Sequence, residues 1–320
     1  MRIGVQMDPI ERIQVEGDTS FAFMLEAQRR GHEVWWFLPD DLYFEEGVLR
    51  AFARQVKLAD TPGGGHFHEL ERDVLEIGHF DVVLVRQDPP FDIAYVANTY
   101  LLELAGGETL VLNDPRGIRN ISEKLATLGF DDLIAATFVG RRLDAMEAFS
   151  RRFPDVVVKP AFLNGGEGVV RLSRDQPDLR ARLAALAAGV GKEPLVVQEF
   201  LPAVVQGDIR VMMLDGEVVG ALRRVPKPGE FRANIHVGGR AEAVALSARE
   251  RETAERVAPL LRREGVLFAG LDLIDGRLTE INVTSPTLVR ELQRLTGIDI
   301  PALFWDRVES RLASAVPAHA

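Results

Sequence analysis

Short apolar stretches alternate with helix-like stretches along the first third of the chain, and this alternation restricts the fold more than any other feature of the sequence. Stretches typical of strands lie at residues 2–6, 32–38, 80–86 and 109–113, and stretches with helical spacing lie at 20–31 and 93–105. Strands that alternate with helices form parallel sheets with helices packed on their faces. The N-terminal part is therefore predicted to be an α/β domain built on a parallel sheet.

The turn after the first apolar stretch tests for a dinucleotide-binding domain, because that fold opens with the same strand and helix. Its fingerprint requires the glycine pattern G-x-G-x-x-G at this turn. Residues 6–18 read QMDPIERIQVEGD and contain one glycine. The sequence therefore excludes a nicotinamide-dependent enzyme of this type.

Size and composition narrow the class of protein further. The chain has 320 residues, which suffices for two domains or one large one. It carries a net charge of −10, has no cysteine, and lacks an apolar run near the roughly 18 residues that a membrane-spanning helix needs. These features argue against a general nucleic-acid binder, a membrane protein and thiolate chemistry. We expect a cytoplasmic protein.

Residues 59–69, ADTPGGGHFHE, are typical of a turn-rich loop. His66 and His68 are close enough in sequence to bind one metal ion together. Histidines in a glycine-rich loop are more often exposed, and we interpret both in that way.

From about residue 120 onward, the pattern changes to strands that pair locally. Apolar stretches at 155–160 and 194–202 predict strands, and residues 208–225 predict a hairpin that turns at Asp215-Gly216. A long amphipathic helix is predicted at 248–264. The second half is expected to have α+β character.

A second hairpin, LDLIDGRLTEINVTSP at residues 271–286, carries oxygen-bearing side chains on otherwise apolar strands. A two-residue turn at Asp275-Gly276 would mix polar and apolar side chains on both faces. A three-residue loop at 274–276, which pairs Leu271 with Thr279, separates one polar face from one apolar face. We prefer the three-residue loop for this reason.

The polar face of this hairpin carries Asp272, Glu280 and Asn282. Two carboxylates and an amide oxygen suit a hard cation, and Mg²⁺ takes few protein oxygens because water and substrate phosphates complete its coordination. A solvated hairpin face has the same pattern, so these residues alone leave both interpretations open.

The segment after the hairpin predicts an anion site. Thr284 or Ser285 can cap a helix, and Pro286 suits the first helical turn. The free N–H groups at a helix N-terminus bind anions, and Arg290, one turn further on, can pair with a carboxylate. A cation site and an anion site are thus expected side by side.

Two further segments are compatible with nucleotide binding. Lys159 ends an apolar strand and precedes a glycine-rich loop at 164–168, whose backbone can approach a phosphate closely. The order differs from that of a P-loop, and an ordinary hairpin loop remains an alternative. The strand at 196–202 can offer backbone groups to an adenine, and Asp208 can accept from a ribose hydroxyl.

These segments occur in an order that is known from one family. The motifs are SEKL with Lys124, VVVKP with Lys159, the glycine-rich loop, QEFLP, GDIR, a basic loop ending in GGR, and LDLIDGRLTEINVTSPT. MDPI, SFAFMLEAQRRGHEV and VRQDPPFD near the N-terminus belong to the same set. The chain resembles the ATP-grasp fold and, within it, the prokaryotic glutathione synthetase family, from residue 2 to about 315. NVTSP, MDPI and DPPFD are specific to this family.

The resemblance implies a domain organisation and a reaction. It implies an N-terminal pre-ATP-grasp domain at 1–121, an ATP-grasp domain at 122–316 with lobes at about 122–200 and 201–316, and a tail at 317–320. The implied reaction uses ATP to phosphorylate the C-terminal carboxylate of γ-glutamylcysteine, which glycine then attacks to give glutathione. Mg²⁺, or alternatively Mn²⁺, is the implied metal, and a homo-oligomer, a tetramer in this family, is the implied assembly.

The resemblance also implies roles for individual residues. The residues implied to bind the nucleotide are Lys124, Lys159, Gly165, Gly166, Gln198, Glu199, Phe200, Leu201 and Asp208. Asp272, Glu280 and Asn282 are implied to hold the metal, and Arg210 and Arg224 to stabilise the acyl phosphate. Ser285, Thr287 and Arg290 are implied to receive the glycine carboxylate, and Arg86 to help bind the dipeptide.

The chain departs from the family pattern in its first lid. The family commonly has K-P-L-x-G-x-G-G, whereas this chain has KPAFLNGGEG, with Leu163 at the first glycine position. Leucine does not readily adopt a positive φ, so if the backbone shape of that glycine is required, we expect this lid to close differently, with a changed rate or nucleotide affinity but no loss of function. A second glycine-containing lid is expected at 226–240. The alternatives are another ATP-grasp carboxylate–amine ligase with a different amino acid acceptor, and a non-catalytic ATP-binding regulator.

Overall fold

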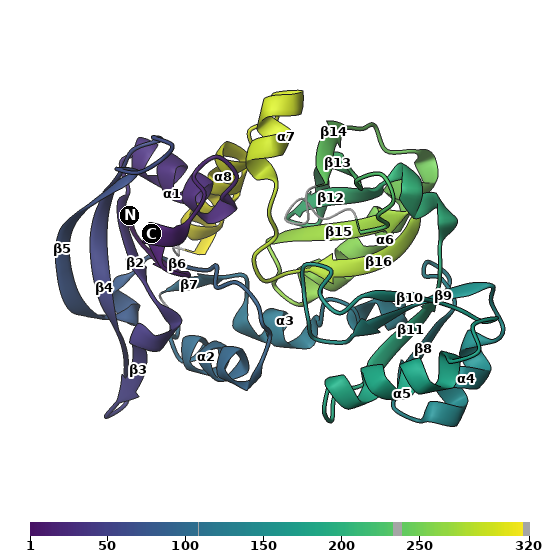
Figure 1. Ribbon diagram of the computed structural model, residues 1–320. Coiled ribbons are helices and arrows are strands. Elements are labelled where there is room, and N and C mark those ends of the chain that lie inside the picture. Colours follow the sequence, from purple (N-terminus) through teal and green to yellow (C-terminus); the bar gives the residue numbers. More distant parts are fainter. Residues whose placement is uncertain (108, 233–238, 316–320) are drawn as a thin grey trace.

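The computed structural model describes residues 1–107, 109–232 and 239–315, which form three β-sheets of seven, four and five strands. In Figure 1 the seven-stranded sheet lies on one side of the molecule and the other two on the opposite side, with α3 (Pro115–Asn120) between them. Short 3-10 helices occur at Ile10–Arg12, Pro39–Asp41, Ile77–His79, Ala126–Gly129 and Pro202–Gln206. No described helix is long and apolar enough to cross a membrane.

The N-terminal sheet contains the predicted parallel strands and an antiparallel extension. The parallel strands follow the order β2-β1-β6-β7, which confirms the predicted parallel sheet. They are β1 (Arg2–Gln6), β2 (Glu33–Phe37), β6 (Val82–Val85) and β7 (Leu110–Leu112), with helices α1 (Thr19–Arg29) and α2 (Ile93–Glu103). The extension, which the sequence pattern does not predict, consists of β3 (Leu42–Glu45), β4 (Val48–Leu58) and β5 (Phe67–Glu76).

The expectation that both histidines of the glycine-rich loop are exposed is wrong for His66. This residue lies directly before β5, and its side chain is buried. Its Nε2 lies 2.8 Å from the carbonyl oxygen of Ile10, and its ring packs edge-on against Phe21. The β4–β5 hairpin therefore folds back onto the segment between β1 and α1, while His68 is exposed as expected.

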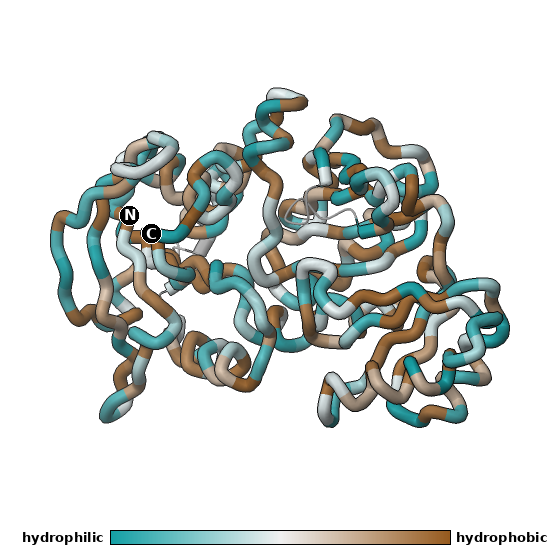
Figure 2. Tube along the Cα trace, in the orientation of Figure 1, coloured by the Kyte–Doolittle hydropathy of each residue, from teal (hydrophilic) through white to brown (hydrophobic). Residues whose placement is uncertain are grey.

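The second half of the chain forms two antiparallel sheets, which confirms the α+β character. The four-stranded sheet has the order β10-β9-β11-β8, and its core includes α4 and α5. Its elements are β8 (Thr137–Gly140), α4 (Leu143–Ser150), β9 (Asp155–Pro160), β10 (Val170–Ser173), α5 (Leu179–Gly189) and β11 (Leu195–Glu199). Figure 2 shows these strands as mostly hydrophobic and the outer turns as mostly hydrophilic.

The five-stranded sheet has the order β14-β13-β12-β15-β16 and packs against α6. Its elements are β12 (Asp208–Leu214), β13 (Glu217–Val225), β14 (Arg240–Ala243), α6 (Ala248–Arg263), β15 (Phe268–Ile274) and β16 (Arg277–Asn282). α6 ends one residue before the predicted boundary. The β12–β13 hairpin turns at Asp215-Gly216 as predicted, with φ values of 54° and 74°.

The β15–β16 hairpin has the predicted faces but not the predicted register. Its turn is the two-residue turn Asp275-Gly276, with φ values of 50° and 70°, and Asp272 pairs directly with Glu280. A β-bulge next to Asp272 leaves Thr279 as an extra residue and shifts the pairing by one position. The predicted three-residue loop is wrong because the bulge, not the turn, brings the polar side chains onto one face.

The end of the chain returns to the N-terminal sheet. It forms α7 (Val289–Thr296) and α8 (Ile300–Ala315). Trp305 of α8 is buried, and its Nε1 donates to the carbonyl oxygen of Phe23 at 2.8 Å. Arg30 of the N-terminal domain donates to Asp306 at 2.8 Å. α8 therefore packs with the N-terminal sheet, and the expected tail at 317–320 lies outside the described residues.

Candidate active site

Two pockets meet at the β15–β16 hairpin. The first is lined by residues of the four-stranded and five-stranded sheets, and the second by residues of the hairpin, the glycine-rich loop and the N-terminal domain. Arg224 and Glu280 line both pockets and therefore form the boundary between them.

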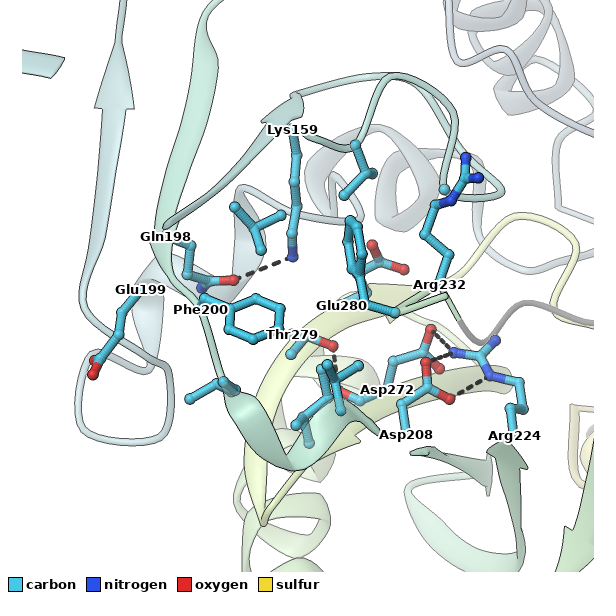
Figure 3. A pocket seen from close by; sticks show the side chains of 17 residues that line it. Lys159, Gln198, Glu199, Phe200, Asp208, Arg224, Arg232, Asp272, Thr279 and Glu280 are labelled. Atoms are coloured by element: carbon cyan, nitrogen blue, oxygen red, sulfur yellow. Dashed lines mark hydrogen bonds and ion pairs between the residues drawn. The ribbon is translucent and has the colours of Figure 1, made fainter. Parts of the chain in front are cut away.

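The first pocket combines apolar walls with a buried lysine. Its apolar lining consists of Val157, Val169, Phe200, Leu201, Val204, Phe231 and Ile274. Lys159 points into it from the end of β9, and its Nζ donates to Oε1 of Gln198 on β11 at 3.2 Å (Figure 3). Burial lowers the pKa of Lys159. An anion bound in this pocket would stabilise the charged form of the lysine.

A network of two arginines and two aspartates lies at the boundary of the pockets. Strand pairing sets it, because Asp208 lies opposite Arg224 and Arg210 lies opposite Asp272. Arg224 donates to Asp208 at 2.6 and 2.8 Å, and its Nη2 lies 2.8 Å from Oδ2 of Asp272 (Figure 3). Nη2 of Arg210 donates to the same oxygen at 2.9 Å. The network fixes both guanidinium groups where they line the second pocket.

The pKa values of the network follow from burial and from these ion pairs. Burial alone would raise the pKa of Asp272, but Arg210 and Arg224 hold it below its usual range. Burial raises the pKa of Asp208 although Arg224 opposes the shift. Asp272 is therefore ionised at neutral pH and has both oxygens engaged by guanidinium groups.

Glu280 lies in an environment with too little positive charge. Burial, followed by the charge of Glu123, raises the pKa of Glu280 to about 8. Nζ of Lys124 lies 2.8 Å from Oε1 of Glu123 but 3.9 Å from Oε1 of Glu280. Burial opposes the charge on Lys124, yet these two carboxylates raise its pKa. The site would thus be stabilised by an added cation next to Glu280.

The donor set around Glu280 fits a divalent cation that binds through oxygen. Asp272, Glu280 and Asn282 share one face of the hairpin, and Nδ2 of Asn282 lies 3.5 Å from Oδ2 of Asp272. Within the described ranges, no group of three His, Cys, Asp or Glu side chains is placed to hold a metal ion. A cation here would have few protein ligands, which is typical of Mg²⁺ completed by water and phosphate.

The second pocket is polar and uses both halves of the chain. Its lining includes Asp88 and Pro89 from the N-terminal domain and Asn164 and Gly165 from the glycine-rich loop. The segment 284–288, after β16, provides the hydroxyl groups of the pocket. The prediction of a helix start at this segment is wrong: α7 begins at Val289, because Leu288 has a φ of 87° and interrupts the helical backbone.

Two predicted substrate-binding arginines lie beside the second pocket rather than in its lining. Arg86 is buried and donates to the carbonyl oxygens of Thr284 at 3.4 Å and Pro286 at 3.2 Å. Arg290 forms an ion pair with Asp60 at 3.1 Å. Either arginine would have to change partners to bind a substrate carboxylate.

The glycine-rich loop accommodates leucine at the family's glycine position. Its left-handed residues are Gly165, Gly166 and Gly168, with φ values of 63°, 80° and 67°. Leu163 is not among the described residues with a positive φ, and its carbonyl oxygen accepts from Lys124 at 2.5 Å. The strain that its sequence position suggested is therefore absent from its described backbone. Of the second expected lid, residues 233–238 lie outside the described residues.

Comparisons with known proteins agree with this architecture. The family models for prokaryotic glutathione synthetase match over residues 1–119 for the N-terminal domain and 123–297 for the ATP-grasp domain. The chain belongs to the prokaryotic glutathione synthetase family. The glutathione synthetase of Mesorhizobium japonicum is 44% identical over 311 residues, which cover 97% of this chain and 99% of that relative. The one from Rhodopseudomonas palustris is 44% identical over 313 residues, which cover 98% and 99%.

The fold of this glutathione synthetase family member also resembles solved ATP-grasp ligases. The structure of the ligase PsnB with a phosphomimetic variant of its minimal precursor, Mg and ADP has a TM-score of 0.65. It is 22% identical and covers 97% of this chain and 98% of its own. At this identity the likeness shows the fold alone, which confirms the predicted ATP-grasp architecture.

The structure places most of the predicted residues of this family member around the two pockets. The first pocket is lined by Lys159, Gly166, Gln198, Glu199, Phe200, Leu201, Asp208, Arg224, Asp272 and Glu280. The second is lined by Gly165, Arg210, Arg224, Glu280, Asn282, Ser285 and Thr287. Lys124 reaches Glu280 at 3.9 Å, and Arg86 and Arg290 line neither pocket.

Sequence reasoning missed three charged residues that line the pockets. Glu123 and Asp88 line the second pocket, and Arg232 lines the first. Glu123 directly precedes Lys124, and Asp88 opens the DPPFD motif, so both lay within motifs already noted. Arg232 lies in the basic loop at 226–240, and the sequence does not indicate which residues of that loop face a pocket.

Proposed function

We propose that this chain is a glutathione synthetase that joins γ-glutamylcysteine to glycine at the expense of ATP. The observation that carries the proposal is the junction of the two pockets at Glu280 and Arg224. One pocket has the apolar walls and buried lysine that suit a nucleotide, and the other has the polar groups that suit a small charged substrate. A phosphoryl group can pass from one pocket to the other across this boundary.

ATP would occupy the first pocket. Lys124 and Lys159 would neutralise its phosphates, and Gly165 and Gly166 would close over them. The strand end at 198–201 would line the adenine. Asp208, whose carboxylate already accepts from Arg224, would offer its remaining lone pairs to a ribose hydroxyl.

Asp272, Glu280 and Asn282 would hold Mg²⁺, for which Mn²⁺ can substitute. A bound divalent cation supplies charge neutralisation to the transferring phosphoryl group. The raised pKa of Glu280 supports this assignment, because that carboxylate lacks a sufficient countercharge within the protein. The Mg and ADP in the PsnB structure support it by analogy of fold.

The chemistry consists of two displacements. A carboxylate oxygen of γ-glutamylcysteine attacks the γ-phosphorus of ATP, the bond to ADP breaks, and an acyl phosphate forms. The glycine amine attacks the acyl carbon, the bond to phosphate breaks, and the amine loses a proton as the amide forms. Arg210 and Arg224 would stabilise the negative charge in both steps, so no protein nucleophile is required.

The acceptor would bind at the segment after β16. The hydroxyl groups of Ser285 and Thr287 line the second pocket and would receive the glycine carboxylate. Arg290 would join them by exchanging the carboxylate of Asp60 for that of the substrate. The family resemblance further favours a cytoplasmic homo-oligomer, a tetramer, which light scattering would test.

The deciding experiment measures phosphate release with ATP, Mg²⁺ and γ-glutamylcysteine, with glycine, alanine, serine or glutamate added in turn. We expect release that depends on glycine and a product with the mass of glutathione. Release with another amino acid alone would assign a different ATP-grasp ligase activity. No release with any of them would contradict an enzymatic function and favour an ATP-binding regulator.

A further inference from the structure

Asn113 joins the N-terminal domain to the base of the metal-site hairpin. It follows β7, is buried, and uses its full hydrogen-bonding capacity on backbone groups of the ATP-grasp domain. Its Nδ2 donates to the carbonyl oxygens of Phe268 at 2.8 Å and Val283 at 2.7 Å. Its Oδ1 accepts from the N–H groups of Leu267 at 2.9 Å and Phe268 at 3.0 Å. Aspartate lacks the two donors, and glutamine is one methylene longer, so only asparagine meets all four groups at this distance.

Arg86 holds the next part of the same segment. It lies directly after β6, the neighbour of β7, and its side chain is buried. Nε donates to Oγ of Ser20 at 3.0 Å, which fixes the plane of the guanidinium group. The two terminal nitrogens then donate to the carbonyl oxygens of Thr284 and Pro286. The carboxyl ends of two adjacent strands thus hold residues 283, 284 and 286 by side-chain hydrogen bonds.

We propose that Arg86 and Asn113 are positioning residues for the acceptor pocket, which they shape by holding residues 283–286. This segment contains Ser285 and connects Asn282 to Thr287, and all three residues line the second pocket. It has no helical or strand hydrogen bonds of its own, so side chains of the N-terminal domain satisfy its carbonyl groups. The identity of the acceptor rests on the proposed function, whereas the positioning does not.

The first pocket, proposed to bind the nucleotide, does not contain the groups that Arg86 and Asn113 hold. Every residue that lines the first pocket lies between positions 157 and 280, within the ATP-grasp domain. The bonds of Arg86 and Asn113 end outside that lining. Loosening residues 283–286 should therefore weaken acceptor binding and leave ATP binding unchanged.

The experiment compares Asn113→Asp, Asn113→Ser and Arg86→Lys with the wild-type enzyme. We expect the KM for the acceptor to rise about tenfold and the KM for ATP to change less than about twofold, because the residues that Arg86 and Asn113 contact lie outside the lining of the first pocket. A purely structural role would lower the melting temperature and leave the ratio of the two KM values unchanged. Equal changes in both KM values, or a change in kcat alone, would overturn the proposal.

Asn120→Asp is the matched control. Nδ2 of Asn120 donates to Glu264 at 2.8 Å, so it also joins the two domains, but on the exposed surface and away from residues 283–286. We expect this variant to keep the wild-type ratio of the two KM values. If Asn120→Asp also raised the acceptor KM without raising the ATP KM, any loosened contact between the domains would produce this effect. That result would overturn the proposal.

A second readout does not depend on turnover. Hydrogen exchange of the folded protein should become faster in residues 283–288 of the variants and stay unchanged in residues 195–201. Unchanged exchange in 283–288 would overturn the positioning role. If the wild type prefers another amino acid, the proposed function fails, and the KM comparison is made with that amino acid. If it releases no phosphate at all, the exchange measurement decides alone.

Discussion

The two pockets differ in how they are built. The proposed nucleotide pocket is formed mainly by strands of one domain, with some loop residues, and its walls are largely apolar. The proposed acceptor pocket is formed mainly by loops from both domains, together with strand residues, and is lined by charged groups, amides and hydroxyls. Binding surfaces on strands are fixed by regular pairing, whereas loops depend on side chains that hold them from outside. If ATP and the acceptor bind as proposed, ATP binding depends mainly on the strands of one domain, and the choice of acceptor depends on the contacts between the domains.

Arg224 and Glu280, which line both pockets, join the two pockets into one site. Arg224 is fixed by Asp208 and Asp272, and Glu280 by its strand pairing opposite Asp272. Both are placed by the five-stranded sheet, which is the rigid element common to the two pockets. A change at this boundary should affect both substrates, and a change away from it should affect one.

The largest effect is expected for Glu280→Gln. Glutamine keeps the shape but removes the charge that would bind the cation, so kcat should fall by about 10²- to 10³-fold or more. Because burial raises the pKa of Glu280, the neutral side chain should not lower the melting temperature. Steady-state kinetics and thermal unfolding of the same preparation check both points.

Glu255→Gln is the control for this variant, since Glu255 is exposed on α6, which packs against the same sheet. It should leave kcat and both KM values unchanged. Normal turnover in Glu280→Gln would remove the metal assignment and, with it, the idea that the boundary serves both pockets.

The difference between the pockets also explains what the sequence could predict. The proposed nucleotide pocket is built from locally encoded strands, such as 155–160, which carries Lys159, and 195–199, so its residues could be found from apolar stretches and motifs. The polar residues of the β15–β16 hairpin were grouped correctly because strand periodicity puts alternate residues on one face. Its register was predicted wrongly because the bulge at Thr279 shifts the pairing by one position, and no residue of the hairpin signals a bulge there.

The acceptor pocket was harder to predict because its supports are far apart in sequence. Arg86 contacts residues 198 and 200 positions later, and Asn113 reaches residues 154 to 170 positions later. The helix start at 284–286 was a local interpretation of cap residues, and the left-handed Leu288 overrides it. No spacing rule indicates such contacts. Of the antiparallel strands at 42–76, β5 was missed because it is mostly exposed and lacks an apolar period, whereas β4 has alternating buried residues and was overlooked.

Phe200→Leu should affect the nucleotide pocket alone. Phe200 lies in the first pocket, next to Phe231, with ring centroids 6.1 Å apart. Leucine retains most of the buried volume but removes the aromatic face, so the KM for ATP should rise about tenfold, or roughly 1.4 kcal/mol. The KM for the acceptor should stay within about twofold. An equal rise in the acceptor KM would show that the pockets are not independent. Phe44→Leu, at an exposed site on β3, is the control.

Arg290→Ala tests a residue outside the lining of the proposed acceptor pocket, with a smaller expected effect. Because Arg290 must exchange Asp60 for the substrate carboxylate, its net contribution should be about fivefold in the acceptor KM, or roughly 1 kcal/mol. Asp60→Asn frees the guanidinium group and should lower the acceptor KM by about twofold. A higher acceptor KM in Arg290→Ala together with a lower one in Asp60→Asn would support this exchange of carboxylate partners. If both variants raise the acceptor KM, the ion pair serves to hold the loop, and Arg290 does not bind substrate.

The smallest effect is expected for Leu163→Gly, which restores the family's glycine in the first lid. The backbone carbonyl of Leu163, not its side chain, accepts from Lys124, and its backbone needs no positive φ. The KM for ATP should therefore change less than about threefold, with a loss of stability of about 0.5–1 kcal/mol from added chain freedom. Gly168→Ala offers the contrast, since its φ is 67° and a Cβ there would lie 2.8 Å from Cγ of Pro160. If Leu163→Gly changes the ATP KM more than Gly168→Ala does, the leucine side chain takes part in lid closure and the backbone explanation is wrong.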